Sequence, residues 1–213
     1  MIFQGIIFDL DGVICSTDEY HYQAWKELAD REGIPFDRSV NNRLRGVSRM
    51  ESLEILLERA KRSYSQEEKE KMAAAKNTRY QELLREMTPA DLSPEVFETL
   101  ETLRKQGLKL AIGSSSKNTK FILARLGLGD YFDAISDGTN ITRSKPDPQV
   151  FLMAADFIGM KPEKCLVVED AKAGIQAAIA GGFDSAGLGE AAACGMATYA
   201  MKTFGDLKGI CGE

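Results

Sequence analysis

Several features that mark common protein classes are missing from this sequence of 213 residues. None of its four cysteines forms a Cys-x-x-Cys pair, so we do not expect a zinc site. The same cysteine pattern suits a protein of a reducing compartment. The net charge of −5 argues against nucleic acid as the main partner. No apolar run approaches the roughly 20 residues that span a bilayer, and the N-terminus lacks the basic segment of a signal peptide. We therefore expect a soluble, cytoplasmic monomer that binds neither nucleic acid nor membrane.

The chain divides by pattern into an all-helical stretch and an alternating stretch. Residues 16–88 carry apolar side chains at helical spacing and three Ser-x-x-Glu capping boxes, at Ser16, Ser48 and Ser65. The rest alternates short apolar runs with helical patterns, which is typical of a parallel sheet covered on both faces. We predict an α/β fold: a Rossmann-like parallel-sheet core of residues 1–15 and 89–213, with an inserted all-helical cap domain of residues 16–88.

Two aspartates follow the first apolar run of the chain. The run at residues 6–8 is typical of a buried strand, and Asp9 and Asp11 come directly after it. Residues two apart lie on the same side of a strand, and Gly12 permits a sharp turn just beyond. Two carboxylates that close repel each other unless a cation or a shared proton intervenes. The pair indicates a divalent metal site beside an acid or nucleophile; the alternative is a pair of solvated loop acids.

Further polar side chains stand at the ends of later predicted strands and in one turn: Ser114, Lys145, Glu169 and Asp170. Ligands of open α/β sheets bind outside the carboxyl ends of the strands, so we expect these side chains to converge with the two aspartates. Oxygen-rich sites of this kind select Mg²⁺, and the lysine and the serine could hold a phosphate. Taken singly, Lys145 could be solvated, and the Glu169–Asp170 pair could cap the next helix.

These motifs resemble those of a known superfamily. Asp9-x-Asp11-Gly12, Ser114, Lys145-Pro146 and Glu169-Asp170 are similar, in order, to the four motifs of the haloacid dehalogenase superfamily of phosphotransferases. The resemblance implies that Asp9 is a nucleophile that forms an aspartyl-phosphate and that Asp11 is the general acid and base. It implies that Ser114 and Lys145 complete the catalytic set. The implied Mg²⁺ ligands are Asp9, Asp11 through its backbone carbonyl, Glu169 and Asp170.

Stretches in both the predicted cap and the predicted core narrow the resemblance to the beta-phosphoglucomutase branch of that superfamily. Residues 11–26, 45–53, 76–77 and 114–118 are similar to its members. That branch interconverts beta-glucose 1-phosphate and glucose 6-phosphate through beta-glucose 1,6-bisphosphate, which implies a small-molecule sugar phosphate as the partner. The substrate-binding residues implied are Thr17, His21, Trp25, Gly46, Arg49, Ser52, Lys76, Ser115, Ser116, Lys117 and Asn118.

Each of the cap residues also has a purely structural alternative. His21, the only histidine, could be a half-buried helix residue, and Trp25 could belong to the core of the cap. Arg49 and Lys76 could be solvated surface cations. A second function stays open as well: a Mg²⁺-dependent sugar-phosphate phosphatase on the same fold, in which water replaces the sugar as the acceptor.

Overall fold

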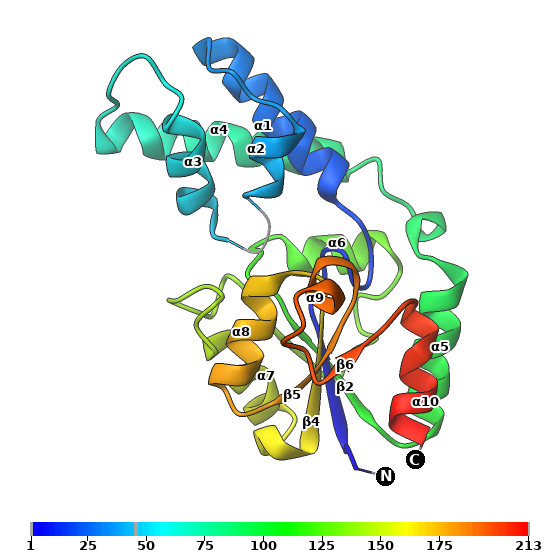
Figure 1. The fold of residues 1–213 in the computed structure, drawn as a ribbon. Helices are drawn as coiled ribbons and strands as arrows, with labels where there is room; N and C mark the ends of the chain where they lie inside the picture. The colour runs from blue at the N-terminus through cyan, green and yellow to red at the C-terminus, as the bar shows by residue number, and fades with distance from the viewer. Residues whose placement is uncertain (1, 45–46, 213) are drawn as a thin grey trace. The chain divides into compact units, whose positions relative to one another are not determined.

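The computed structural model describes residues 2–44 and 47–212. The chain divides into two compact units, each described here by itself (Figure 1). Met1–Ser16 together with Thr88–Glu213 form the first, which we call the sheet unit. Thr17–Met87 form the second, which we call the helical unit.

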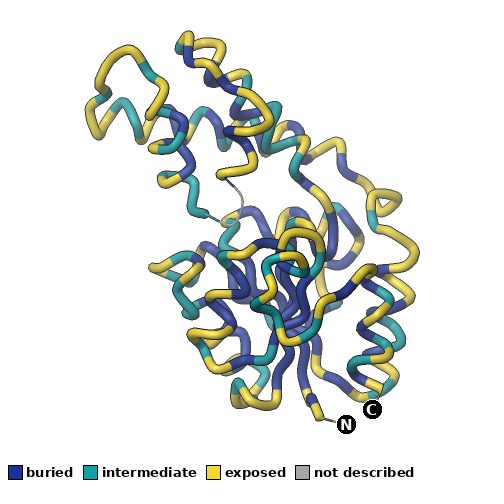
Figure 2. Tube along the Cα trace, in the orientation of Figure 1, coloured by how far each residue is buried: buried dark blue, intermediate teal, exposed yellow. Residues whose placement is uncertain are grey.

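A six-stranded parallel sheet is the centre of the sheet unit, which confirms the predicted α/β fold. The strand order is β3-β2-β1-β4-β5-β6. The strands are β1 Gly5–Phe8, β2 Lys109–Gly113, β3 Ala134–Ser136, β4 Cys165–Glu169, β5 Asp184–Gly187 and β6 Tyr199–Ala200. Every residue of β1 and β4 is buried, as expected for strands covered on both faces (Figure 2).

Helices cover both faces of this sheet. They are α5 Pro94–Lys105, α6 Thr119–Arg125, α7 Gln149–Phe157, α8 Lys172–Ala180, α9 Gly189–Ala193 and α10 Leu207–Gly212. Short 3₁₀ turns lie at Pro89–Asp91, Pro162–Lys164 and Phe204–Asp206. Helices α7 and α8 lie on one side of the sheet, and α5 and α10 lie on the other (Figure 1). The core under α7 includes Ile7, Ala111 and Val167 from three neighbouring strands, packed against Val150 and Phe151.

Four helices make up the described part of the helical unit: α1 Asp18–Glu32, α2 Arg38–Asn42, α3 Arg49–Leu57 and α4 Gln66–Leu84. Capping boxes at Ser48 and Ser65 begin α3 and α4, as predicted. The box predicted at Ser16 is wrong. The N-cap of α1 is Thr17, whose ψ of 7° departs from the extended backbone of a capping residue and which makes no side-chain capping bond.

The last part of the chain holds several short regular elements. Strands β5 and β6 and helices α9 and α10 were not predicted, because each is too short to show a clear period. In the part of the chain that the structure describes, no helix combines the length and the apolar character that crossing a membrane requires.

Candidate active site

The register of the sheet determines where Asp9 lies. Phe8, the last residue of β1, is paired with Ile112 of β2 on one side and with Val168 of β4 on the other. The next residue, Asp9, donates its backbone N–H to the Val168 carbonyl at 2.9 Å. Its carboxyl group therefore stands at the carboxyl edge of the sheet, between the ends of two neighbouring strands, and only 7% of the residue is exposed.

A buried lysine, Lys145, contacts the acids at the ends of strands β1 and β4. The Lys145 ammonium donates to Asp9 Oδ1 at 2.5 Å and also to Glu169 Oε1. Lys145 and Glu169 are 3% and 1% exposed, so water screens neither charge. Glu169 Oε2 in turn accepts the backbone N–H groups of Asp170 and Ala171, at 3.0 and 3.1 Å. Both N–H groups precede α8, which begins at Lys172 and has no side-chain capping bond, so the alternative that Glu169 caps the next helix is wrong.

Burial and neighbouring charges shift the pKa values of Glu169 and Lys145. Burial raises the pKa of Glu169 to about 7; the ammonium of Lys145 opposes this shift, and the Asp9 carboxylate adds to it. Burial alone would lower the pKa of Lys145, but the two carboxylates outweigh it and raise the pKa above its ordinary value. Lys145 therefore stays an ammonium at neutral pH, in the place where negative charge accumulates.

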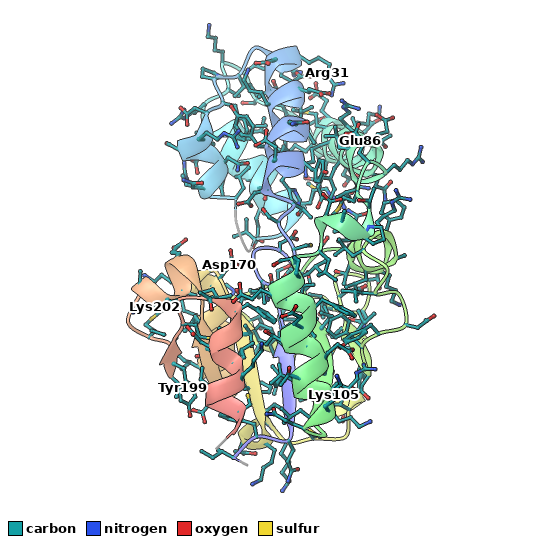
Figure 3. The ribbon with its side chains drawn as sticks, turned by 90° about the vertical axis from the view of Figure 1, so that its right-hand side faces the viewer. Arg31, Glu86, Lys105, Asp170, Tyr199 and Lys202 are labelled. Atoms are coloured by element: carbon teal, nitrogen blue, oxygen red, sulfur yellow. The ribbon has the colours of Figure 1, made fainter. Side chains whose placement is uncertain are left out.

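Asp170 completes an acidic group beside Asp9. Carboxylate oxygens of Asp9, Glu169 and Asp170 all lie within 4.8 Å of one another, and Asp170 lies at the carboxyl edge of the sheet (Figure 3). A Cβ at Gly12 would lie 2.1 Å from Asp170 Oδ2, so the carboxylate packs directly on the glycine. The three residues together offer carboxylate oxygens, and hard oxygen donors of this kind suit a hard divalent cation. The donor set therefore fits a divalent metal.

Asp11 lies in the turn that follows Asp9. It forms an isolated bridge with Cys15, and the turn is closed by Gly12 N–H donating to the Cys15 carbonyl at 2.7 Å. The Asp11 carboxylate is outside the group of three acids, and its backbone carbonyl as a metal ligand stays a prediction. The turn needs glycine at position 12, where φ is +83°.

The loop after β2 carries Ser114 and the four other candidates that follow it. Ser114 Oγ accepts from Ser116 N–H, and Ser116 Oγ accepts from Asn118 N–H, both at 3.2 Å. Each hydroxyl accepts inside the loop, so its proton is directed elsewhere and can be donated to a phosphate oxygen. Lys117 is exposed and Asn118 is buried. Ser115 Oγ is buried without a hydrogen-bond partner among the described residues.

The helical unit brings His21 and Lys76 together. Lys76 Nζ lies 2.8 Å from His21 Nδ1, and because an ammonium only donates, Nδ1 accepts and the ring proton is on Nε2. Burial, together with the positive charges of Lys76 and Arg49, lowers the pKa of His21 well below its ordinary value. The imidazole is therefore neutral at pH 7 and presents Nε2–H as a donor. Lys76 is buried, which excludes the solvated-cation alternative for it.

Trp25 belongs to the core of the helical unit and also borders this pair. It is 2% exposed and packs with Leu28, Leu53 and Leu56. Lys76 Nζ lies 4.8 Å from its ring centroid, within the range of a cation–π contact. Trp25 therefore belongs to the core of the helical unit, as the structural alternative predicted, and it also contacts Lys76, a candidate substrate-binding residue.

Arg49 is the first residue of α3, and Ser52 lies one turn further along the same helix. Burial lowers the pKa of Arg49, and no carboxylate pairs with it among the described residues. A cation at the N-terminus of a helix is opposed by the helix dipole, so this arginine favours an external anion. Ser52 is buried. Gly46, another candidate, lies outside the described residues.

Sequence reasoning missed Tyr80. Its ring stacks on His21, with centroids 4.0 Å apart, and its hydroxyl donates to Thr17 Oγ1 at 3.0 Å. In the sequence, Tyr80 occupies one of the positions at helical spacing that indicate the apolar face of a charged helix. Only its spacing of four from Lys76, which places the two on one helix face, could have indicated it.

Known proteins resemble this chain over most of its length. Residues 3–182 match the family model described as haloacid dehalogenase-like hydrolase. Beta-phosphoglucomutase of Bacillus subtilis (strain 168) is 44% identical over 88% of this chain and 84% of its own length. Phosphorylated carbohydrates phosphatase of Thermotoga maritima is 33% identical over 85% and 82% of the two chains.

A solved structure agrees with these sequence matches. The crystal structure of beta-phosphoglucomutase from Clostridium difficile is similar with a TM-score of 0.91 and 39% identity, covering 97% of this chain and 93% of that one. The acidic strand-end group and these matches lead to one conclusion: the chain belongs to the haloacid dehalogenase-like hydrolase family.

Proposed function

We propose that this protein is a beta-phosphoglucomutase, which interconverts beta-glucose 1-phosphate and glucose 6-phosphate through an aspartyl-phosphate enzyme and beta-glucose 1,6-bisphosphate. The observation that carries the proposal is the 44% identity to the Bacillus enzyme over 88% of the chain. Because the helical unit alone takes up residues 17–87, a match of that extent must include most of it. The likeness therefore extends beyond the phosphoryl-transfer core that mutases and phosphatases share.

Asp9 and Asp11 divide the chemistry in this proposal. An Asp9 oxygen bonds to phosphorus as the bond from phosphorus to the sugar oxygen breaks, and Asp11 protonates that departing oxygen. In the second half, Asp11 removes the proton of the acceptor hydroxyl, that oxygen bonds to phosphorus, and the bond to Asp9 breaks. The contact of Lys145 with Asp9 Oδ1, at 2.5 Å, supports a role in neutralising the transferring oxygens.

Asp9, Glu169 and Asp170, with the Asp11 backbone carbonyl, would hold Mg²⁺. The ion, when bound, neutralises phosphate oxygens so that an anionic carboxylate can approach an anionic phosphate. Support for this choice of metal is the all-oxygen donor set, which Mg²⁺ prefers over the softer ions that bind cysteine and histidine.

The helical unit supplies the groups that we propose recognise the sugar phosphate. Arg49 has no carboxylate partner among the described residues, whereas Arg38 and Arg43 are paired with glutamates at 2.8 Å. A guanidinium without an acidic partner suits bidentate contact with the phosphate that is not being transferred. The neutral His21 presents its Nε2–H as a donor to an oxygen of the substrate.

The competing function is hydrolysis, because a relative at 33% identity is named a phosphatase of phosphorylated carbohydrates. The test is incubation with beta-glucose 1-phosphate, Mg²⁺ and a trace of beta-glucose 1,6-bisphosphate, following glucose 6-phosphate and free phosphate together. We expect glucose 6-phosphate to accumulate in large excess over phosphate. Free phosphate as the main product would replace the mutase by the phosphatase.

A cytoplasmic monomer completes the proposal. The four cysteines are free and three of them are buried, which suits a reducing compartment. Light scattering coupled to size-exclusion chromatography measures the mass in solution, and we expect the mass of a monomer. The mass of a dimer would refute the monomeric state and leave the proposed reaction unchanged.

A further inference from the structure

Tyr80 contacts three of the residues that we propose bind the substrate. Its ring stacks on the imidazole of His21, with the centroids 4.0 Å apart and the planes inclined by 26°. Its hydroxyl donates to Thr17 Oγ1 at 3.0 Å, and Lys76 Nζ lies 4.4 Å from its ring centroid. Tyr80 itself is 1% exposed and Thr17 is fully buried. One buried side chain thus connects the start of α1, the first turn of α1 and the middle of α4.

We propose that Tyr80 is a positioning residue: its ring fixes the His21 imidazole, and its hydroxyl fixes the Thr17 side chain. The catalytic consequence rests on the proposed function, whereas the orienting role follows from contacts within the helical unit. Tyr80 touches no reacting atom in this proposal. It acts through His21 and Thr17.

The geometry of α4 explains how Tyr80 and Lys76 together orient the His21 ring. Lys76 and Tyr80 are four residues apart, so both project from the same face of the helix toward α1. Lys76 donates to Nδ1 of the His21 ring, while Tyr80 covers one flat face of the ring. Turning the ring over would exchange Nδ1 for a carbon and lose the Lys76 bond, and tilting it would lose the stacking. The two contacts together leave Nε2–H in one direction.

The stacked ring also controls the protonation of His21. The positive charges that face the imidazole are Lys76 from α4 and Arg49 from α3, and both disfavour a proton on it. Burial is the largest cause of the lowered pKa of His21, and the Tyr80 ring supplies cover on one face. Removing the ring admits water, which stabilises the imidazolium, whereas removing only the hydroxyl does not.

The single histidine makes a direct test possible. ¹⁵N NMR of the full-length protein reports the pKa and the tautomer of His21 without any substrate, for wild type, Tyr80→Phe and Tyr80→Leu. We expect Tyr80→Phe to keep the low pKa and the Nε2–H tautomer. In Tyr80→Leu we expect the pKa to rise by about one unit or more, toward 6.5, with both tautomers present.

Tyr64→Leu is the matched control. Tyr64 belongs to the same unit, its hydroxyl also donates to a side chain, Glu32 at 3.2 Å, and a cation, Arg62, lies 3.8 Å above its ring. Its loss should leave the His21 spectrum unchanged. An unchanged spectrum in Tyr80→Leu as well would overturn the role of the ring. If Tyr80→Leu does not fold, Tyr80→Met fills the volume with a flexible apolar chain and decides in its place.

The hydroxyl is tested by a double-mutant cycle. Tyr80→Phe and Thr17→Val each remove one partner of the bond, and we expect each to lower kcat about tenfold, with the double variant no worse than either single one. Additive losses would show that the hydroxyl does not act through Thr17. If no mutase turnover is found in wild type, the proposed function fails, and the NMR titration still decides the orienting role.

Discussion

Gly12 and Asp170 are in contact: a Cβ on the glycine would lie 2.1 Å from the carboxylate Oδ2. The missing side chain at one position thus makes the space for a candidate metal ligand at the other. Gly12 also has a φ of +83°. Both the backbone conformation of this turn and the contact with Asp170 therefore favour glycine at position 12.

Gly12→Ala should therefore weaken the metal site. The added methyl displaces the Asp170 carboxylate, and we expect Mg²⁺ affinity to fall about 10- to 100-fold, measured by calorimetric titration. Gly107→Ala is the control, because Gly107 has a similar φ of +85° but nothing within 4 Å of its Cβ position. It should lose about 1–2 kcal/mol of stability and keep its metal affinity. Equal metal loss in both variants would assign the effect to backbone strain.

Gly138→Ala should disturb the loop after β2. Its Cβ would lie 2.4 Å from the Ser115 carbonyl and 2.9 Å from Lys117 N, both backbone atoms that cannot rotate away. We expect kcat/KM for beta-glucose 1-phosphate to fall about tenfold or more, since small displacements of positioning groups are costly. In Gly129→Ala the nearest atom is 3.8 Å away, so activity should be retained. Full activity of Gly138→Ala would show that the loop does not hold the substrate.

Arg49→Ala should impair use of the sugar phosphate and spare phosphorylation by a small acyl phosphate. The lost contact is a hydrogen bond to a charged group, worth about 1.5–3 kcal/mol, so kcat/KM should fall roughly 10- to 100-fold. Steady-state kinetics with acetyl phosphate as the second substrate separate the two effects. Arg43→Ala, which removes an exposed ion pair with Glu58, should behave like wild type. An equal loss with both substrates would contradict a role for Arg49 in substrate recognition.

Asp9→Asn should abolish the phosphoenzyme, because an amide oxygen is a poor nucleophile. Intact-protein mass spectrometry after exposure to acetyl phosphate and Mg²⁺ provides the measurement. Asp156→Asn, at an exposed position of α7, should still be phosphorylated. A phosphoenzyme in Asp9→Asn would refute the assignment of the nucleophile.

His21 should make the protein less stable in mild acid. Its pKa is lowered in the folded state, so the unfolded chain takes up the proton first as the pH falls below about 6.5. The free energy of unfolding should therefore decrease toward the lower folded pKa, by at most about 1.4 kcal/mol per pH unit. Urea unfolding between pH 7 and 5.5 measures it. His21→Gln should have a flatter profile, and an identical slope would exclude His21 as the cause.

Much of the sheet unit's site could be predicted from local sequence. Asp9 and Glu169 each end a short apolar run, and parallel strands bring such ends to one edge. Ser48 and Ser65 could be assigned as helix starts because a capping box is complete within four residues. Ser16 has the same pattern but does not cap, because the N-cap position of α1 is occupied by the next residue, Thr17.

Other features depend on contacts between distant segments. The sequence places Glu169 at a strand end, but only the structure shows that one of its oxygens contacts Lys145 and that the other accepts two backbone N–H groups. Tyr80 is similar: its spacing from Lys76 places both residues on one face of α4, but only the structure shows that its ring stacks on His21. Such pairs form because helices and strands pack, which no short stretch of sequence encodes.

The amino-acid sequence by itself determined the α/β class, the order of the acidic, hydroxyl and lysine motifs, and the presence of a separate helical stretch, because periodicity and strand-end chemistry are local properties. The tertiary structure alone decided which atoms meet. Whether Lys145 faces Asp9 or solvent, and whether His21 is neutral, depends on burial and on the direction of side chains from different elements. Those quantities exist only once the chain has packed.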